Sequence, residues 1–158
     1  MFRNVTRVRQ QLTQEECVRL LTEEKRGVLS VRGDDDYPYG VPLNHYYDPE
    51  DGHLYFHSGP NGHKIDAIRQ WDKASFCVID SGSSAEGEWA LRFRSVIVFG
   101  RVRIVEDHEK ALSISRKLSL KFTDDMNYIE QEIIKSGPRV LCFELVPEWI
   151  TGKRVVES

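Results

Sequence analysis

The segment LYFHSGPNGHKIDAIRQW, residues 54–71, places two histidines and a lysine around a glycine-rich turn. Its pattern predicts a strand, a turn and then a helix, with Asn61 as the N-cap and Gly62, His63 and Lys64 as the first helical residues. A lysine at this end is unfavourable by up to about 1 kcal/mol, because the helix dipole already makes the N-terminus positive. The position of Lys64 is therefore unfavourable unless another group compensates its charge.

An anion held between the helix amides and the Lys64 ammonium would remove this conflict, because the first amides of a helix have no partner inside it. Gly59 and Gly62 would let the backbone approach such a group closely. The alternative is a solvated lysine on an ordinary capped helix. The turn alone leaves both interpretations open, and the first of them indicates a phosphate site.

A second candidate feature is the segment YPYGVPLNHYYD, residues 37–48. Pro42 cannot donate to a sheet ladder, so it predicts an edge strand or a bulge. Asn44, two residues later, could offer its amide and neighbouring backbone groups to a planar polar ligand. The alternative is an edge strand that its proline protects from aggregation.

The histidines raise the question of a metal. His53 and His57 would share a face of one strand, and His45 could approach from the neighbouring strand. No carboxylate with ligand spacing joins them, so we expect no metal site. We interpret His45 and His53 as partly exposed strand histidines, whereas His57 flanks the proposed anion turn.

Composition limits the class of protein. The 158 residues suit a single domain over residues 1–158. The net charge of −3 gives no basic excess for nucleic acid, and no apolar run approaches the length of a membrane span. The first residues lack the apolar core of a signal peptide, so we expect a cytoplasmic protein. The cysteines are widely spaced and are interpreted as small buried hydrophobes: Cys17, Cys77 and Cys142.

The remaining pattern predicts how these residues are positioned. The first helix is expected to start at Thr13, with Glu16 completing a capping box, and to end at Gly27 in a left-handed conformation. Further helices are expected to start near Asn61, near Asp107 and at Asp124 or Asp125. Strands are expected over residues 27–32, 37–48, 53–57, 73–80, 91–105 and 139–150, with 151–158 as a tail or short strand.

The strand over residues 91–105 is apolar on both faces in its first half, so both faces should be covered, and another subunit is one candidate for the second cover. Gly100 predicts a bend or a close approach in this strand. Because helices and strands do not alternate regularly, the pattern favours a mainly β fold with flanking helices, built on a six-stranded, largely antiparallel barrel.

The succession YPYGVPLNHYYD, LYFHSGPNGHKIDAI, FRSVIVFGRVRIVED and WITGKR resembles the pyridoxamine 5′-phosphate oxidase-like flavoproteins. It is most similar to the branch related to nitroimidazole-resistance proteins. The resemblance covers nearly the whole chain. It implies a split β-barrel that binds FMN at the interface of a homodimer, which would also cover the second face of the long strand.

The resemblance implies a role for each candidate residue. The backbone of residues 41–44 would meet the polar edge of the isoalloxazine ring, and the β-strand before the turn would flank the ribityl chain and phosphate. The first helical residues would bind the phosphate, and C-terminal residues would reach the flavin from the partner subunit. The implied cofactor-binding residues are Val41, Pro42, Leu43, Asn44, His57, Ser58, His63, Lys64, Arg94, Ser95, Trp149 and Lys153.

The implied activity is FMN-dependent reduction of a small acceptor, such as a nitroaromatic or a quinone, with NAD(P)H or another reductant as hydride donor. His57 is the candidate for proton delivery, because its unperturbed pKa lies near neutral; alternatively, it only hydrogen-bonds the cofactor. The chain lacks the longer arginine-containing C-terminal motif of the oxidase proper, which argues against pyridoxamine phosphate as substrate. Open alternatives are a module that binds flavin, haem or deazaflavin without turnover, and a ligand-free structural dimer.

Overall fold

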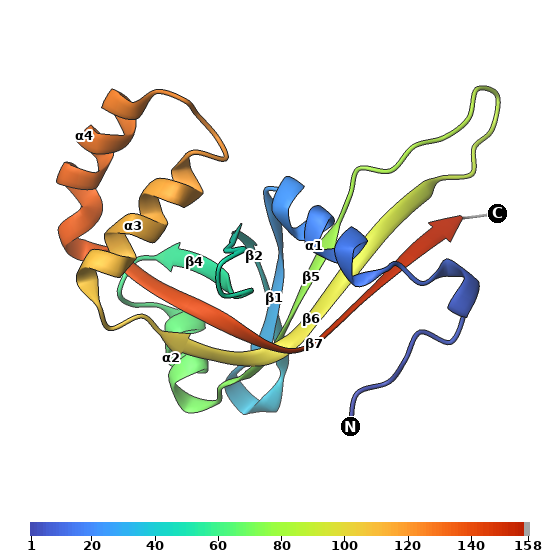
Figure 1. The fold of residues 1–158 in the computed structure, drawn as a ribbon. Helices are drawn as coiled ribbons and strands as arrows, with labels where there is room; N and C mark the ends of the chain where they lie inside the picture. The colour runs from blue at the N-terminus through green and yellow to red at the C-terminus, as the bar shows by residue number, and fades with distance from the viewer. Residues whose placement is uncertain (157–158) are drawn as a thin grey trace.

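The computed structural model describes residues 1–156, whose strands form one curled antiparallel sheet (Figure 1). The sheet order is β2-β1-β5-β6-β7-β4-β3. The strands are β1 (Arg26–Arg32), β2 (Pro38–Asn44), β3 (Tyr46–Tyr47), β4 (Leu54–Ser58), β5 (Lys73–Ile79), β6 (Arg92–Ile104) and β7 (Leu141–Val156). The expected mainly β, antiparallel barrel with flanking helices is confirmed. Within residues 1–156 it has seven strands rather than six, because the predicted strand over 37–48 is interrupted at His45.

The helices are α1 (Gln14–Glu23), α2 (His63–Gln70), α3 (His108–Ser119) and α4 (Met126–Ser136). Figure 1 shows α3 and α4 side by side at one end of β6 and β7. The main core joins the buried faces of the strands, and α1 and α2 each bury one apolar face in it. These faces consist of Cys17, Leu20 and Leu21 from α1 and Ile65, Ala67 and Ile68 from α2. No helix within residues 1–156 is long and apolar enough to cross a membrane.

The start of α1 confirms the predicted capping box. The amide of Glu16 donates to Thr13 Oγ1 over 3.1 Å, and the amide of Thr13 donates to Glu16 Oε2 over 2.8 Å. The predicted end of the helix is wrong, because α1 stops at Glu23 and Gly27 lies inside β1. A Cβ at Gly27 would lie 2.4 Å from the carbonyl oxygen of Cys77. The glycine therefore serves close strand packing rather than helix termination.

The predicted irregularity at Gly100 is confirmed. The register between β6 and β7 shifts between Phe99 and Gly100, and a Cβ at Gly100 would lie 2.1 Å from the carbonyl oxygen of Val146. Only glycine fits this close approach, which lets two long strands bend together around the core.

The two faces of β6 have different covers. Val96 and Val98 are fully buried toward the core. On the outer face, the N-terminal segment lies along β6 and β7, and the ring of Phe2 stacks on Trp149 at 6.0 Å and lies 5.5 Å from Phe99. Part of the predicted second cover therefore comes from the chain itself.

Two smaller predictions concern the C-terminus and the cysteines. Residues 151–156 continue β7, whereas residues 157 and 158, the end of the predicted tail, lie outside the described residues. Cys17 and Cys142 are fully buried, as expected, and Cys77 is half-buried on the outer face of β5.

Candidate functional site

The first part of the candidate site is the start of α2. Its N-cap is Gly62, at φ 130° and ψ 170°, rather than the predicted Asn61, and no side chain of residues 1–156 caps the helix. Three other helices are capped by their own side chains, which are those of Thr13, Asp107 and Asp125. The first amides of α2 are thus left to another acceptor.

The loop before α2 leaves open space beside these amides. A Cβ placed on Gly59 or Gly62 would meet no atom of residues 1–156 within 4 Å. The hydroxyl of Ser58, at the end of β4, is buried and has no hydrogen-bond partner within residues 1–156. A buried hydroxyl without a hydrogen-bond partner is unfavourable, so the position of Ser58 is compatible with a bound ligand that supplies this partner.

His57 and Lys64 lie close enough to interact. The surrounding chain partly desolvates the imidazole of His57 and lowers its pKa, and the ammonium group of Lys64 lowers that pKa further. Lys64 is itself half-buried. The structure therefore brings both predicted residues to the same turn, with His57 favoured in its neutral form at neutral pH.

His63 is placed differently from the other residues of the turn. Its ring stacks on that of Tyr39 at a centroid distance of 4.0 Å, and its Nε2 lies 3.9 Å from the carboxylate of Asp34. The imidazole thus links the start of α2 to β2 and to the loop before it. Its backbone amide remains at the start of the helix, and a contact between His63 and a phosphate stays a prediction.

The second part of the candidate site lies on β2. This strand is at the end of the sheet order and, among the described strands, pairs only with β1, so the edge position predicted from Pro42 is confirmed. Side chains alternate along a strand, and Val41 and Leu43 pack against the core. Any contact of these two residues with a ligand outside the barrel would therefore be made by their backbone.

The strand register places further candidates on the outer face of the same sheet. One cross-strand row runs from Pro42 through Val28, Cys77 and Ile97 to Thr151. Adjacent rows pair Ser95 with Lys153, and Phe99 with Trp149. Pro42, Ser95, Trp149 and Lys153 thus share one surface, although β1 and β5 separate β2 from β6.

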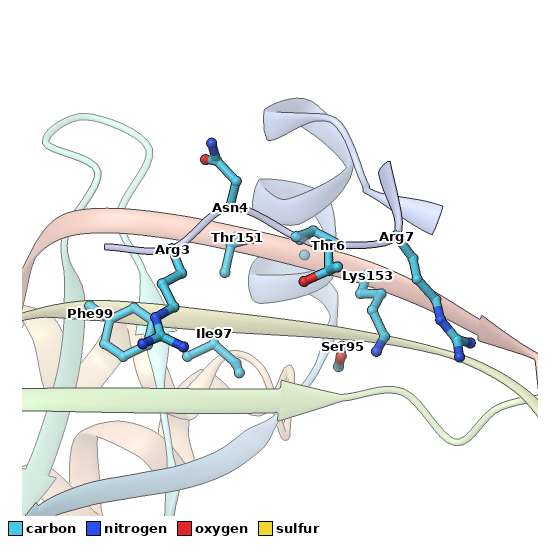
Figure 2. Close-up of a pocket in the computed structure, with 11 residues that line it drawn as sticks. Arg3, Asn4, Thr6, Arg7, Ser95, Ile97, Phe99, Thr151 and Lys153 are labelled. Carbon is cyan, nitrogen blue, oxygen red and sulfur yellow. The ribbon is translucent and has the colours of Figure 1, made fainter. Parts of the chain in front are cut away.

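A basic pocket of about 470 Å³ lies on this outer face, between β6, β7 and the N-terminal segment. Figure 2 shows the side chains of Arg3 and Arg7 extending from the N-terminal segment toward β6 and β7, which carry Ser95, Phe99 and Lys153. No acidic residue among those described lines the pocket. Sequence reasoning missed Arg3 and Arg7, whose only signal is the basic character of the segment FRNVTRVR.

Arg94 has a local partner. Its Nε donates to Asp80 Oδ2 over 2.9 Å, and its amide donates to Asp80 Oδ1 over 3.0 Å. Backbone and side-chain hydrogen bonds from Arg94 lower the pKa of Asp80, although burial acts in the opposite direction. The pair fastens the end of β5 to the start of β6, and a flavin contact of Arg94 stays a prediction.

A second cavity, here named the helical cleft, has a volume of about 340 Å³ between α3, α4 and the ends of β2 and β4. Asn44 and His57, both candidates from the sequence, form part of its wall. The rest of the wall comes from α3, α4, their connection and the segment between α4 and β7. It includes Leu118, Phe122, Tyr128, Ile129, Glu132 and Ile133.

The structure also brings together groups that the histidine analysis missed. Asp51, His53 and Glu144 each place one ligand atom within 4.8 Å of the others. Glu144 is buried, and its carboxylate accepts from Arg103 Nε and lies 3.0 Å from His53 Nδ1. An arginine therefore already neutralises the buried carboxylate. The carboxylate–histidine contact depends on the pairing of β4 with β7, which sequence spacing does not reveal.

Comparisons with known proteins agree with this architecture. A model of the family described as pyridoxamine 5′-phosphate oxidase matches residues 13–154. A candidate 5-nitroimidazole antibiotic resistance protein from Bacteroides thetaiotaomicron is similar in structure, with a TM-score of 0.78, 19% identity and coverage of 93% of this chain and 87% of that chain. No curated protein matches the chain.

Two further solved structures are similar. A FAD-binding protein from Mesorhizobium loti has a TM-score of 0.66 and 25% identity, over 92% of this chain and 97% of that chain. A FAD- and haem-binding protein from Mycobacterium smegmatis has a TM-score of 0.71 and 17% identity, over 91% of this chain and 72% of that chain. Since the family model spans nearly the whole sheet and the helices that flank it, the chain belongs to the pyridoxamine 5′-phosphate oxidase family.

Proposed function

We propose that this protein is a homodimeric FMN-dependent oxidoreductase that reduces a small acceptor. The observation that carries the proposal is the start of α2, which combines amides without a side-chain cap, a half-buried Lys64 and open space at Gly59 and Gly62. The preceding strand ends at Ser58, whose buried hydroxyl has no partner within residues 1–156. These groups are donors or cations, which is the chemistry that a phosphate monoester needs. Membership of the family and the flavin ligands named for two similar structures support the choice of flavin.

The isoalloxazine ring would lie along the edge of β2. An edge strand has backbone groups on one side without a strand partner, and these suit the polar edge of a planar ring. Pro42 has no amide and its side chain is exposed on the outer face, so it would contribute a flat apolar contact. Asn44 would offer its side-chain amide from the end of the same strand.

The outer face of the sheet supports the homodimer. Val28 is 41% exposed and Ile79 is 58% exposed, on the same face as Ser95 and Lys153. Apolar side chains exposed on a sheet that also carries a basic pocket suit a partner that buries both. In this arrangement Lys153 and Trp149 of one protomer approach the flavin held by Lys64 of the other.

A mixed dimer tests this placement. We expect Lys64→Met and Lys153→Met each to weaken FMN binding when every protomer carries the substitution. A dimer with Lys64→Met in one protomer and Lys153→Met in its partner would contain one intact site, provided that each site takes one lysine from each protomer. Half of its sites should then bind FMN with wild-type affinity in a fluorescence titration. Recovery of no wild-type site would contradict the shared site.

Bound FMN would supply hydride transfer through its N5 atom, taking a hydride from a reduced nicotinamide and giving it to the acceptor. An acceptor nitro group that takes up this hydride and one further proton becomes a nitroso group and releases water, so the reaction needs a proton source. His57 is the titratable side chain that both the turn and the helical cleft contact. Its proposed role is to hold or deliver this proton at the imidazole.

The pH dependence follows from the lowered pKa of His57. If the protonated imidazole delivers the proton, reoxidation of the reduced protein by a nitroaromatic should speed up as pH falls, with a midpoint below the ordinary value of about 6.5. His57→Gln should remove this acid limb while leaving FMN affinity within about threefold. Lys64→Met, studied at saturating FMN, should move the midpoint upward, because it removes a cation from beside His57.

The same experiment separates an enzyme from a binding module. Bound flavin that remains reduced with nitroaromatics and quinones would contradict the oxidoreductase assignment and leave a binding protein. A pH profile that is identical in wild type and His57→Gln would restrict His57 to a hydrogen bond with the cofactor.

A further inference from the structure

The helical cleft offers a binding surface that extends beyond the proposed flavin site and shares Asn44 and His57 with it. Its volume of about 340 Å³ lies within the usual range for small-molecule sites and equals that of about eleven water molecules. We infer that the cleft binds the acceptor, and that the acceptor is an uncharged or cationic molecule built on one substituted aromatic ring. This inference rests on the proposed function, because it assigns the substrate of the same reaction.

The position of the cleft is the first argument. Asn44 and His57 line it, and these residues come from the ends of β2 and β4, the two strands that flank the proposed flavin position. A molecule in the cleft therefore contacts the same side chains that the flavin is expected to approach. No other cavity described for residues 1–156 includes His57.

The wall of the cleft favours a planar apolar body. Leu118 and Ile129 are buried at its base, while Phe122 and Tyr128 are 40% and 56% exposed and offer aromatic surface at its rim. Aromatic rings stabilise a second ring by offset or edge contacts in addition to the area that they bury. An aromatic acceptor would therefore gain from both the base and the rim.

The polar groups of the cleft favour a neutral or cationic molecule. The hydroxyls of Ser115 and Ser119 donate to backbone carbonyls of α3, over 2.9 and 2.8 Å. The side chains that remain as candidates for polar contacts with a ligand are those of Asn44, His57, Thr123, Tyr128, Glu132 and Ser136.

The charged residues of the wall also favour a neutral or cationic ligand over an anion. Glu132 is the carboxylate on the wall, and no lysine or arginine among the described residues lines the cleft. An anion there would lose its hydration, would gain no counter-ion from the wall itself and would face the like charge of Glu132. The basic pocket has the opposite character, so the fold separates a place for anions from a place for the acceptor.

Filling the cleft tests the inference without flavin chemistry. In the flavin-free protein, 4-nitrobenzyl alcohol should shift the amide NMR signals of the α3–α4 connection, and Ile133→Trp should weaken this binding at least about tenfold. Ile134→Trp is the matched control, since Ile134 is the next residue of α4, is 76% exposed and does not line the cleft. It should leave binding within about twofold.

Reversing the charge tests the selectivity. Glu132→Lys should raise the preference for 4-nitrobenzoate over 4-nitrobenzyl alcohol by about tenfold, because it supplies the missing counter-ion. The control Gln131→Lys places the same side chain on the neighbouring exposed position of α4, outside the cleft, and should leave the ratio unchanged.

The outcomes separate the two proposals. Cleft binding in a protein that takes up no flavin would sustain the cleft and contradict the proposed function. A protein that binds FMN and reduces 4-nitrobenzyl alcohol equally well with Ile133→Trp would sustain the function and overturn the cleft assignment. Dissociation of the dimer by Ile133→Trp, without any binding of the alcohol to the wild type, would identify the cleft as a subunit contact and also overturn the inference.

Discussion

Replacing Lys64 with methionine is expected to weaken FMN binding by about 10- to 150-fold. A charge-assisted hydrogen bond to a phosphate contributes about 1.5–3 kcal/mol, and each 1.4 kcal/mol is a factor of ten in affinity. The effect should lie near the upper end, because Lys64 is half-buried and the helix amides alone cannot neutralise a dianion. Quenching of flavin fluorescence during titration of the flavin-free protein gives the dissociation constant directly.

Two control variants separate this effect from a general loss of charge. Lys64→Arg keeps the positive charge and should retain most of the affinity. Lys135→Met removes an exposed lysine from the last turn of α4 and should change FMN affinity less than twofold. Equal affinities for wild type and Lys64→Met would show that the ammonium group does not contact the phosphate.

The second large effect concerns stability in acid and comes from His45. This residue was predicted to be a partly exposed strand histidine, and that prediction is wrong, because its side chain is completely buried. Its Nε2 lies 2.7 Å from the carbonyl oxygen of Leu21 and so donates to it. Burial, reinforced by the nearby Lys121 ammonium, lowers the pKa of His45 to about 4.

The direction of the pH effect follows from this shift. Between pH 6.5 and about 4 the unfolded chain binds a proton at His45 that the folded chain does not, so the free energy of unfolding falls as pH falls. A difference of about 2.5 pKa units corresponds to a loss of roughly 3 kcal/mol across this range. Above pH 6.5 neither the folded nor the unfolded chain binds a proton at His45, so this residue no longer makes stability depend on pH.

Comparison with His45→Gln isolates this contribution from other titrating groups. The glutamine amide can donate to Leu21 as the imidazole does, but it does not titrate. In urea unfolding at pH 7 and pH 4.5, the wild type should lose about 2–3 kcal/mol more stability than the variant. Parallel losses in the two proteins would show that His45 does not control acid stability.

Features fixed by neighbouring residues could be predicted from the sequence. The capping box of Thr13 and Glu16 depends on residues three apart, and the edge position of Pro42 depends on its missing amide. Gly100 was identified because a glycine inside an apolar strand indicates a close backbone approach, and the β6–β7 register shows that approach. Local rules of this kind also gave the antiparallel fold and most element positions.

Features that depend on chain pairing could not be predicted. Asn61 is the better N-cap by residue type, yet Gly62 caps α2, because the loop enters the helix at a positive φ that glycine adopts without strain. Glu144 reaches His53 only through the β4–β7 pairing, and Arg3 reaches the outer face of β6 only because the N-terminal segment crosses it. The burial of His45 likewise follows from its place between β2 and β3 and its contact with α1.

The measurement that tests the central claim most directly compares FMN with riboflavin, which lacks only the phosphate. If the start of α2 holds the phosphate, the wild-type protein should bind FMN at least about a hundredfold more tightly than riboflavin. Lys64→Met should reduce this ratio by about tenfold or more while changing riboflavin affinity little. Equal affinities for the two flavins in the wild type would contradict a phosphate site at the start of α2.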